Sequence, residues 1–262
     1  MINQTAVMMG AFRYEFMMQI RRRSLWITFF LIACLLIILT TRVANPRAGD
    51  MFAKFLAQHS LTYNVAYWIY TFNRLFPLGV GCLLADRLVR DFRTKSDELF
   101  MTTPGTLSSR LLGKYVGTLL ATLIPLFIAD ITYPILTTGN LLAIPIALEV
   151  FATMVLPGML FITAFALACP VFLWVPLFQF CFIGYWFWGN ELSTRNGIPT
   201  LSNTVLTPIG SYMAAGFYGI GEFTNVSATP MQGVESILVL VGIAVLVMIA
   251  LWWFLKYRQT RQ

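Results

Sequence analysis

The chain has 262 residues, of which 58% are hydrophobic and only 11% charged, and its formal net charge is +7. A water-soluble protein does not expose that much apolar surface without aggregating, so the composition excludes an ordinary soluble domain and favours a protein whose solvent is lipid. The four cysteines all fall in apolar segments. We therefore interpret them as small buried hydrophobic residues and expect neither disulfides nor a metal site.

The residues before the first apolar run, 1–23, predict a helix that lies on the membrane surface. Four apolar residues in this segment are spaced by four, so they lie on one face of a helix. They are Met8, Phe12, Phe16 and Ile20. Together with the arginine triplet that follows, they indicate an interfacial helix on the inner leaflet. A basic flank that only sets topology would explain the arginines but not the apolar stripe.

Six apolar segments predict six membrane-spanning helices in an all-α integral membrane protein, because a spanning helix needs about 20 mainly apolar residues. They comprise approximately residues 25–41, 63–84, 116–136, 141–168, 171–188 and 237–255. Only an apolar turn around Cys169 and Pro170 separates the fourth span from the fifth. The combined segment is nevertheless long enough for about two bilayer crossings.

The distribution of basic residues predicts the orientation of these spans. Most of the 18 lysines and arginines precede the first span, lie between the second and third, or follow the sixth. Cytoplasmic segments collect such residues, so we expect both termini in the cytoplasm and the chain in the cell inner (cytoplasmic) membrane. The whole chain, residues 1–262, is then a single transmembrane domain.

The one sizeable predicted cytoplasmic loop, residues 85–114, mixes charges of both signs. Topology explains its bases but not its acids, which are Asp86, Asp91, Asp97 and Glu98. Apolar residues also recur at near-helical spacing, at Leu88, Phe92, Leu99 and Phe100. The pattern predicts a short amphipathic helix that ends before Pro104-Gly105. Such a helix is either a docking surface for a soluble protein or part of a solvated loop.

The segment "DELFMTTPGTLSSRLLGKYVGTLL", residues 97–120, with the mixed charges before it, resembles the permease subunits of type-2 ATP-binding cassette (ABC) exporters. These permeases have an acid-rich turn, a leucine-rich piece, a Thr-Pro, a basic spacer and a Gly-Lys that opens the third span. The matching residues are, in order, Thr103-Pro104, Arg110 and Gly113-Lys114. This chain has Ser96-Asp97 where the family usually has Gly-Thr, which leaves the local turn undecided.

The resemblance implies a division of labour between subunits. The loop would be a coupling helix in a cleft of a separate ATPase subunit, and residues 1–23 would be the elbow helix. The coupling residues would be Asp91, Arg93, Asp97, Glu98, Leu99, Phe100 and Thr103. Two ATPase copies would hydrolyse ATP, and a second permease chain, either identical or a paralogue, would complete the path. The chain itself would then be neither an enzyme nor a cofactor carrier, and it would bind membrane lipid but no nucleic acid.

Three ionisable residues are predicted at membrane depth: Arg74, Asp130 and Glu149. An unpaired charge there is costly, and the estimated depths overlap, so we expect Arg74 to pair with one of the two acids. Such a cluster would either hold the second, third and fourth spans together or form a polar patch on the export path. Both interpretations stay open at this point.

Two further segments are candidates for the lining of an export path and for a cover at its outer end. Phe178 and Phe182 in the fifth predicted span either line a hydrophobic vestibule or simply face lipid. The outer loop, residues 190–235, has an apolar middle at Val205–Gly221, which predicts a re-entrant or interfacial helical hairpin before the last span.

Sequence motifs for chemistry are missing from the chain. The single histidine, His59, excludes a His-Glu-x-x-His zinc site, and the spacing from Gly105 to Gly113 is wrong for a phosphate-binding loop. Two function classes therefore remain. One is the permease of an ATP-driven exporter, and the other is a membrane scaffold or anchor whose cytoplasmic helix recruits a partner.

Overall fold

The computed structural model describes residues 4–40, 54, 57–93, 105–192, 199–202 and 204–260, and the regular elements in these ranges are all helical. The elements are α1 (Gln4–Ile20), α2 (Arg23–Thr40), α4 (Leu61–Asn73), α5 (Phe76–Leu84), α6 (Arg87–Arg93), α8 (Leu107–Thr138), α9 (Ala143–Val150), η1 (Phe151–Val155), α10 (Leu156–Ala168), η2 (Cys169–Val171), α11 (Val175–Trp186), η3 (Phe187–Glu191), α12 (Ser211–Tyr218), α13 (Gly221–Thr224) and α14 (Pro230–Gln259). The prediction of an all-α protein is confirmed for these residues.

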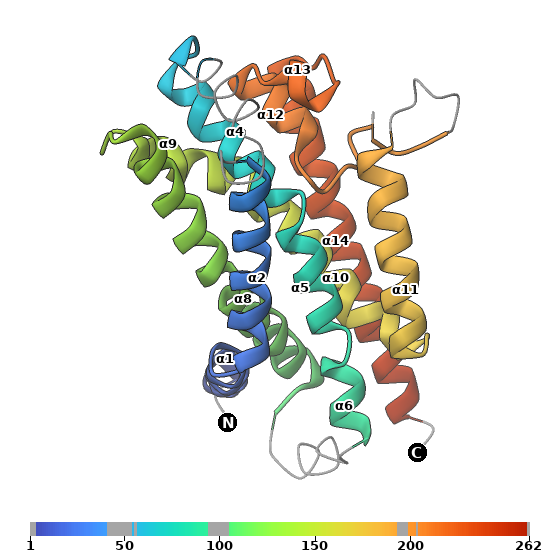
Figure 1. Cartoon of the computed structure of the whole chain (residues 1–262). Coiled ribbons are helices and arrows are strands. Elements are labelled where there is room, and N and C mark those ends of the chain that lie inside the picture. Colours follow the sequence, from blue (N-terminus) through green and yellow to red (C-terminus); the bar gives the residue numbers. More distant parts are fainter. Residues whose placement is uncertain are drawn as a thin grey trace.

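The helices form an upright bundle with one helix lying across its base (Figure 1). The long axes of α2, α5, α8, α11 and α14 run roughly parallel, whereas α1 is seen nearly end-on beneath α2 (Figure 1). The last turn of α14, α1 and α6 lie at one end of the bundle, and α12 and α13 lie at the other (Figure 1). We call the first of these ends the base.

Three helical segments are long and apolar enough to cross a membrane: Leu107–Thr138, Ala143–Val171 and Pro230–Gln259. They contain the third, fourth and sixth predicted spans. A shorter apolar helix, Arg23–Leu36, overlaps the first predicted span. The second predicted span is divided into α4 and α5, and the fifth consists of α11 followed by the π-helical turn η3.

The break between α4 and α5 is stabilised by partners from distant parts of the chain. Pro77 lies in the first turn of α5, where its missing N–H is tolerated. The Arg74 carbonyl accepts a hydrogen bond of 2.7 Å from the Trp186 indole Nε1. The Asn73 side-chain amide donates to the carbonyl of Ile209, also at 2.7 Å. The Arg74 carbonyl at the break is thus satisfied inside the protein, as a low-dielectric setting requires.

The segment predicted as an outer hairpin, Val205–Gly221, contains α12, which with α13 covers one end of α14 and α4 (Figure 1). Glycines with positive φ flank α12: Gly210 has φ 90° and Gly219 has φ 71°. Met213 and Ala214 are completely buried, because α12 packs against protein on that face. The Val205–Gly221 segment is therefore apolar because it contributes to the core of the bundle.

A close approach of backbones anchors this outer region to α10. A Cβ atom added at Gly158 would overlap the carbonyl oxygen of Pro208, which precedes α12 by a few residues. Only a residue without a side chain fits at this contact. Gly184 in α11, by contrast, has open space around its missing side chain.

The fold therefore predicts opposite effects for two glycine substitutions. Gly158→Ala should lower the free energy of unfolding by about 1–3 kcal/mol, because backbone must move to admit the methyl group. Gly184→Ala should leave it unchanged or raise it by about 0.5–1 kcal/mol through helix propensity. Thermal unfolding of the detergent-solubilised chain measures both. Equal shifts in the two variants would contradict the close approach at Gly158.

Candidate functional site

The structure describes both ends of the predicted coupling loop. Asp91 and Arg93 lie in α6, and the next described range begins at Gly105, just before α8. The other predicted coupling residues lie outside the described residues: Asp97, Glu98, Leu99, Phe100 and Thr103. The candidate site is thus the base from which the loop leaves the bundle and to which it returns.

The base depends on a close contact between α1 and α8. A Cβ atom at Gly113 would lie 2.5 Å from the Met8 carbonyl oxygen, and one at Gly117 would lie 2.7 Å from the Phe12 carbonyl oxygen. The two glycines are four positions apart, so they share one face of α8. Small residues at this spacing let two helix backbones approach closely, as in membrane helix pairs.

This contact turns polar residues of α1 inward. Glu15 and Gln19 are buried, whereas Met9 and Tyr14 are 55% and 60% exposed. The predicted apolar stripe at Met8, Phe12, Phe16 and Ile20 is only partly buried rather than presented outward. Residue spacing within α1 could not predict which face is buried, because that face is determined by the contact with Gly113 and Gly117 of α8.

A buried lysine joins three helices at the base. Lys114 of α8 donates from Nζ to Glu15 Oε1 of α1 at 2.5 Å and to Asp91 Oδ2 of α6. The side chains of Lys114 and Glu15 are 9% and 5% exposed, and that of Asp91 is 23% exposed. One ammonium group is therefore shared by two carboxylates from separate helices. Charge-assisted bonds of this kind are the strong ones in a poorly solvated setting.

A second buried cation lies beside it. Arg87 of α6 is 1% exposed and donates from Nη2 to Oε1 of Gln19. Burial, and then the nearby charge of Arg22, lower the pKa of Arg87 to about 10. The guanidinium still carries its charge at neutral pH, since that pKa is about three units above it. Its Nε and Nη1 have no hydrogen-bond partner among the described residues.

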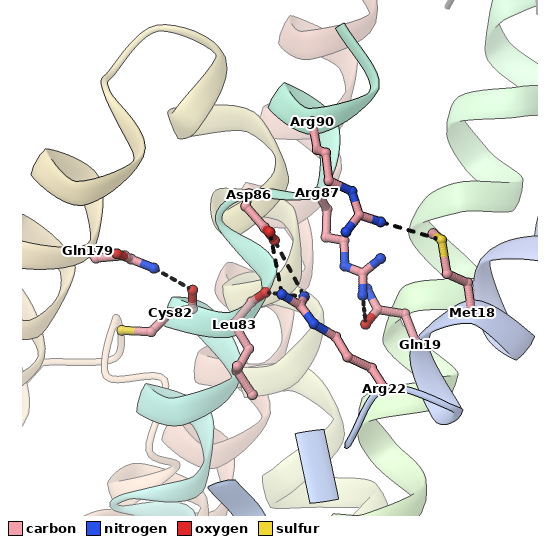
Figure 2. A network of polar contacts seen from close by, with 9 residues as sticks. All are labelled: Met18, Gln19, Arg22, Cys82, Leu83, Asp86, Arg87, Arg90 and Gln179. Carbon is pink, nitrogen blue, oxygen red and sulfur yellow. Dashed lines mark hydrogen bonds and ion pairs between the residues drawn. The ribbon is translucent and has the colours of Figure 1, made fainter. Parts of the chain in front are cut away.

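Further contacts tie the segment between α5 and α6 to the start of α2 (Figure 2). Arg22 donates to the Leu83 carbonyl oxygen at 3.3 Å and pairs with Asp86 at 3.4 Å. Arg90 approaches the Met18 sulfur at 3.5 Å. Figure 2 shows Arg87 and Arg90 reaching toward α1, whereas Arg22 reaches from the α1–α2 turn toward Asp86. We call the set of Glu15, Gln19, Arg22, Asp86, Arg87, Asp91 and Lys114 the base cluster.

Most members of the base cluster were not predicted. Asp91 was assigned to an ATPase contact and Lys114 only to the Gly-Lys motif; the structure gives both an intramolecular partner. The available signal was Glu15, an isolated acid in an otherwise basic N-terminal segment. A lone acid in that setting indicates a specific cationic partner, but the sequence does not say which one.

The predicted intramembrane pairing is wrong. Arg74 pairs with Glu191 at the end of η3, with Nε to Oε1 at 2.8 Å, rather than with Asp130 or Glu149. Glu149 is exposed on α9. The physical reason is the break at Arg74, which directs its side chain toward the end of α11 and η3 rather than across to α8.

Asp130 of α8 stands alone. It is 1% exposed, and neither carboxylate oxygen has a hydrogen-bond partner among the described residues. A buried carboxyl group without partners destabilises a fold. Its presence is therefore not explained by the ion-pair cluster that the sequence predicted.

The two candidate vestibule residues belong to the hydrophobic core. Phe178 and Phe182 of α11 are buried and stacked on each other, with ring centroids 5.6 Å apart. A Cβ atom added at Gly81 of α5 would overlap the Phe182 ring. Both rings therefore fill space between α11 and α5, and neither lines a vestibule in this structure.

Comparisons with known proteins identify no relative: no family model, no curated protein and no solved structure matches the chain.

The shared lysine generates a stability prediction. Lys114→Met should lower the free energy of unfolding by about 3–5 kcal/mol, because it removes the ammonium group that pairs with the buried carboxylate of Glu15. Adding Glu15→Gln should restore part of that loss, with a coupling of about 0.5–3 kcal/mol. Arg13→Met, at an exposed position of α1, is the control and should change stability by less than about 0.5 kcal/mol. Strictly additive effects of Lys114→Met and Glu15→Gln would show that the two groups do not interact.

Replacement of Asp130 tests whether its carboxyl group has a structural role or a functional one. Asp130→Val should leave the free energy of unfolding unchanged or raise it by about 1–3 kcal/mol, because it removes an unpartnered buried carboxyl group. Thermal unfolding in detergent measures this. If the variant is less stable by more than about 1 kcal/mol, the carboxyl group has a structural role after all. A variant that is stable but no longer transports would indicate that the carboxyl group has a role in transport.

Proposed function

We propose that this chain is the membrane-spanning permease subunit of an ATP-driven exporter similar to the type-2 ABC class. In this proposal two permease chains, a homodimer or a pair of paralogues, form the path through the cell inner membrane. Two copies of a separate ATPase subunit dock on the cytoplasmic loop, residues 94–104 and its flanks. Both termini and the base of the bundle face the cytoplasm.

The observation that carries the proposal is the base cluster. Asp91 at the end of α6 and Lys114 near the start of α8 flank the loop on both sides and bond to each other. Lys114 is also tied to α1 through Glu15, and α8 contacts α1 at Gly113. A solvated loop that only connects two spans needs no such anchoring. A loop that transmits force does, because displacement of a loosely held segment would be absorbed by its own ends.

The ion pairs of the base cluster support a specific mechanism by which movement of the loop reaches the helices. An ATPase subunit that moves the loop would move α6 and the start of α8 as one unit, because Lys114 bridges them. The same lysine would carry the displacement to α1 through Glu15, and the Arg22–Asp86 pair would carry it to the start of α2. The loop would therefore act on several helices of the bundle at once.

Six spans fit the arrangement of the bundle. The proposed spans are α2, α4 with α5, α8, α9 to α10, α11 with η3, and α14, and α1 would be the interfacial elbow helix. The crosswise orientation of α1 at the base supports that role (Figure 1). Met9 and Tyr14 on its exposed side would contact the headgroup region.

The loop itself provides the test against an anchor or scaffold. Phe100→Ala should weaken binding of the ATPase subunit about 30-fold, which corresponds to an interface anchor worth about 2 kcal/mol. Membrane insertion should remain intact, because the basic residues that set topology are unchanged. Affinity purification of the full chain from membranes, followed by quantification of the co-purified ATPase, measures the effect.

The matched control is Phe172→Ala, an exposed phenylalanine outside the loop and next to η2, which should not alter recovery of the ATPase. Purification of the wild-type chain with a partner that lacks a nucleotide-binding site would favour the scaffold. Wild-type binding and transport by both Phe100→Ala and Glu98→Lys would remove the main support for the exporter.

A further inference from the structure

The surface of the bundle carries a groove between α8, α10 and α14. It has a volume of about 360 Å³, at the lower end of the range for ligand sites. Residues that line it include Leu111, Tyr115, Leu160, Ala244, Met248 and Trp252. Its floor is packed, because Ala244 is 3% exposed and the Tyr115 hydroxyl donates to the Leu160 carbonyl at 2.9 Å. The groove is therefore a feature of the folded chain with a satisfied polar edge.

The groove is long and apolar along α14. Its lining on this helix extends from Val241 to Trp252, which is about 16 Å at the rise of an α-helix. Helix α14 is the least buried of the three helices that are long enough to cross a membrane. Val245 and Ile249 on the rim are 52% and 48% exposed, so the groove opens sideways toward the surroundings of the bundle.

Apart from the Tyr115 hydroxyl, which is bonded to Leu160, the polar side chains of the groove lie at the end nearest the base. Ser108 of α8 lines that end, and its hydroxyl lies 3.1 Å from the hydroxyl of Thr106. The exposed Lys256 lies one turn beyond Trp252, with its Nζ 5.1 Å from the centre of that ring. A cation and two hydroxyl groups thus mark one end of an apolar channel, and the other end has no charge among its lining residues.

From this polarity we propose that the groove binds one acyl chain of an anionic phospholipid, with the phosphate near Lys256 and Ser108. The complementarity is of two kinds: apolar length for the chain and positive charge for the headgroup at the level of the base. Zwitterionic lipid offers the same chain but no net negative charge for the lysine. The site therefore discriminates by headgroup, unlike the general layer of lipid around a spanning helix. This inference requires that the chain lies in a membrane but not that it transports anything.

Two neighbouring positions allow a matched test. Val245 lines the groove and Leu246 does not, although both are exposed on α14. Val245→Trp fills the groove from its open side without touching the core, and Leu246→Trp adds the same indole to the outer surface. Lys256→Gln removes the cation and leaves the groove open.

The experiment incubates the purified full chain with vesicles of phosphatidylglycerol or phosphatidylcholine that carry a photoactivatable acyl chain. After illumination, mass spectrometry of the peptides counts adducts at α8 and α14. Phosphatidylglycerol should label the groove residues in preference, and Val245→Trp should lower that labelling about tenfold, with no change in Leu246→Trp. Lys256→Gln should abolish the preference for phosphatidylglycerol over phosphatidylcholine.

Two outcomes would overturn the proposal. Equal labelling by both lipids, unaffected by Val245→Trp, would mean that the groove holds only the general lipid layer. Loss of a dimer in Val245→Trp, seen by native mass spectrometry, would mean that a second copy of the chain covers the groove instead.

Discussion

A buried ammonium group shared by two carboxylates is the constraint on which the rest of the base depends. Lys114, Glu15 and Asp91 belong to three helices that are distant in sequence, and each is costly to bury alone. Only a fold that brings all three together satisfies them. The charge set therefore selects one arrangement of α1, α6 and α8, and with it the positions of the end of α6 and the start of α8.

The lysine can reach both partners because α8 offers glycines where α1 crosses it. Side chains at Gly113 and Gly117 would hold the two backbones apart, and Glu15 would no longer lie beside Lys114. The same logic operates farther up the bundle. There the break between α4 and α5 is stabilised by two hydrogen bonds. One runs from Trp186 to the Arg74 carbonyl, and the other runs from Asn73 to the Ile209 carbonyl. In both places, close backbone contacts or buried hydrogen bonds hold segments that are distant in the sequence together.

Local patterns predicted the parts of the fold that local physics determines. Long apolar runs identified α8, α10 and α14, because helix length and hydropathy are properties of one segment. The mixed charges between the second and third predicted spans include Asp91, which the structure pairs with Lys114. The partner of Arg74 could not be found in this way, because Glu191 lies far along the chain and outside the predicted span. The burial of Glu15 and Gln19 on α1 could not be predicted for a similar reason, since the face that packs against protein depends on α8.

The aromatic residues illustrate the same limit. Phe178 and Phe182 could face lipid, a path or the core, and spacing along α11 does not distinguish these environments. Gly81 on α5 places Phe182 in the core, because its missing side chain leaves room for the Phe182 ring. Asp130 is the reverse case: its depth was predicted from the sequence, but the structure gives its carboxyl group no partner among the described residues. It is the residue whose presence the fold explains least.

The central claim is that the loop anchored by the base cluster receives an ATPase subunit. The most direct measurement replaces Phe100 with a photo-crosslinking amino acid in the full chain, illuminates native membranes and identifies the attached protein by mass spectrometry. The account predicts a protein with a phosphate-binding loop for ATP, captured less efficiently when Lys114→Met loosens the base. Capture of a protein without a nucleotide-binding site, or of lipid alone, would contradict the account.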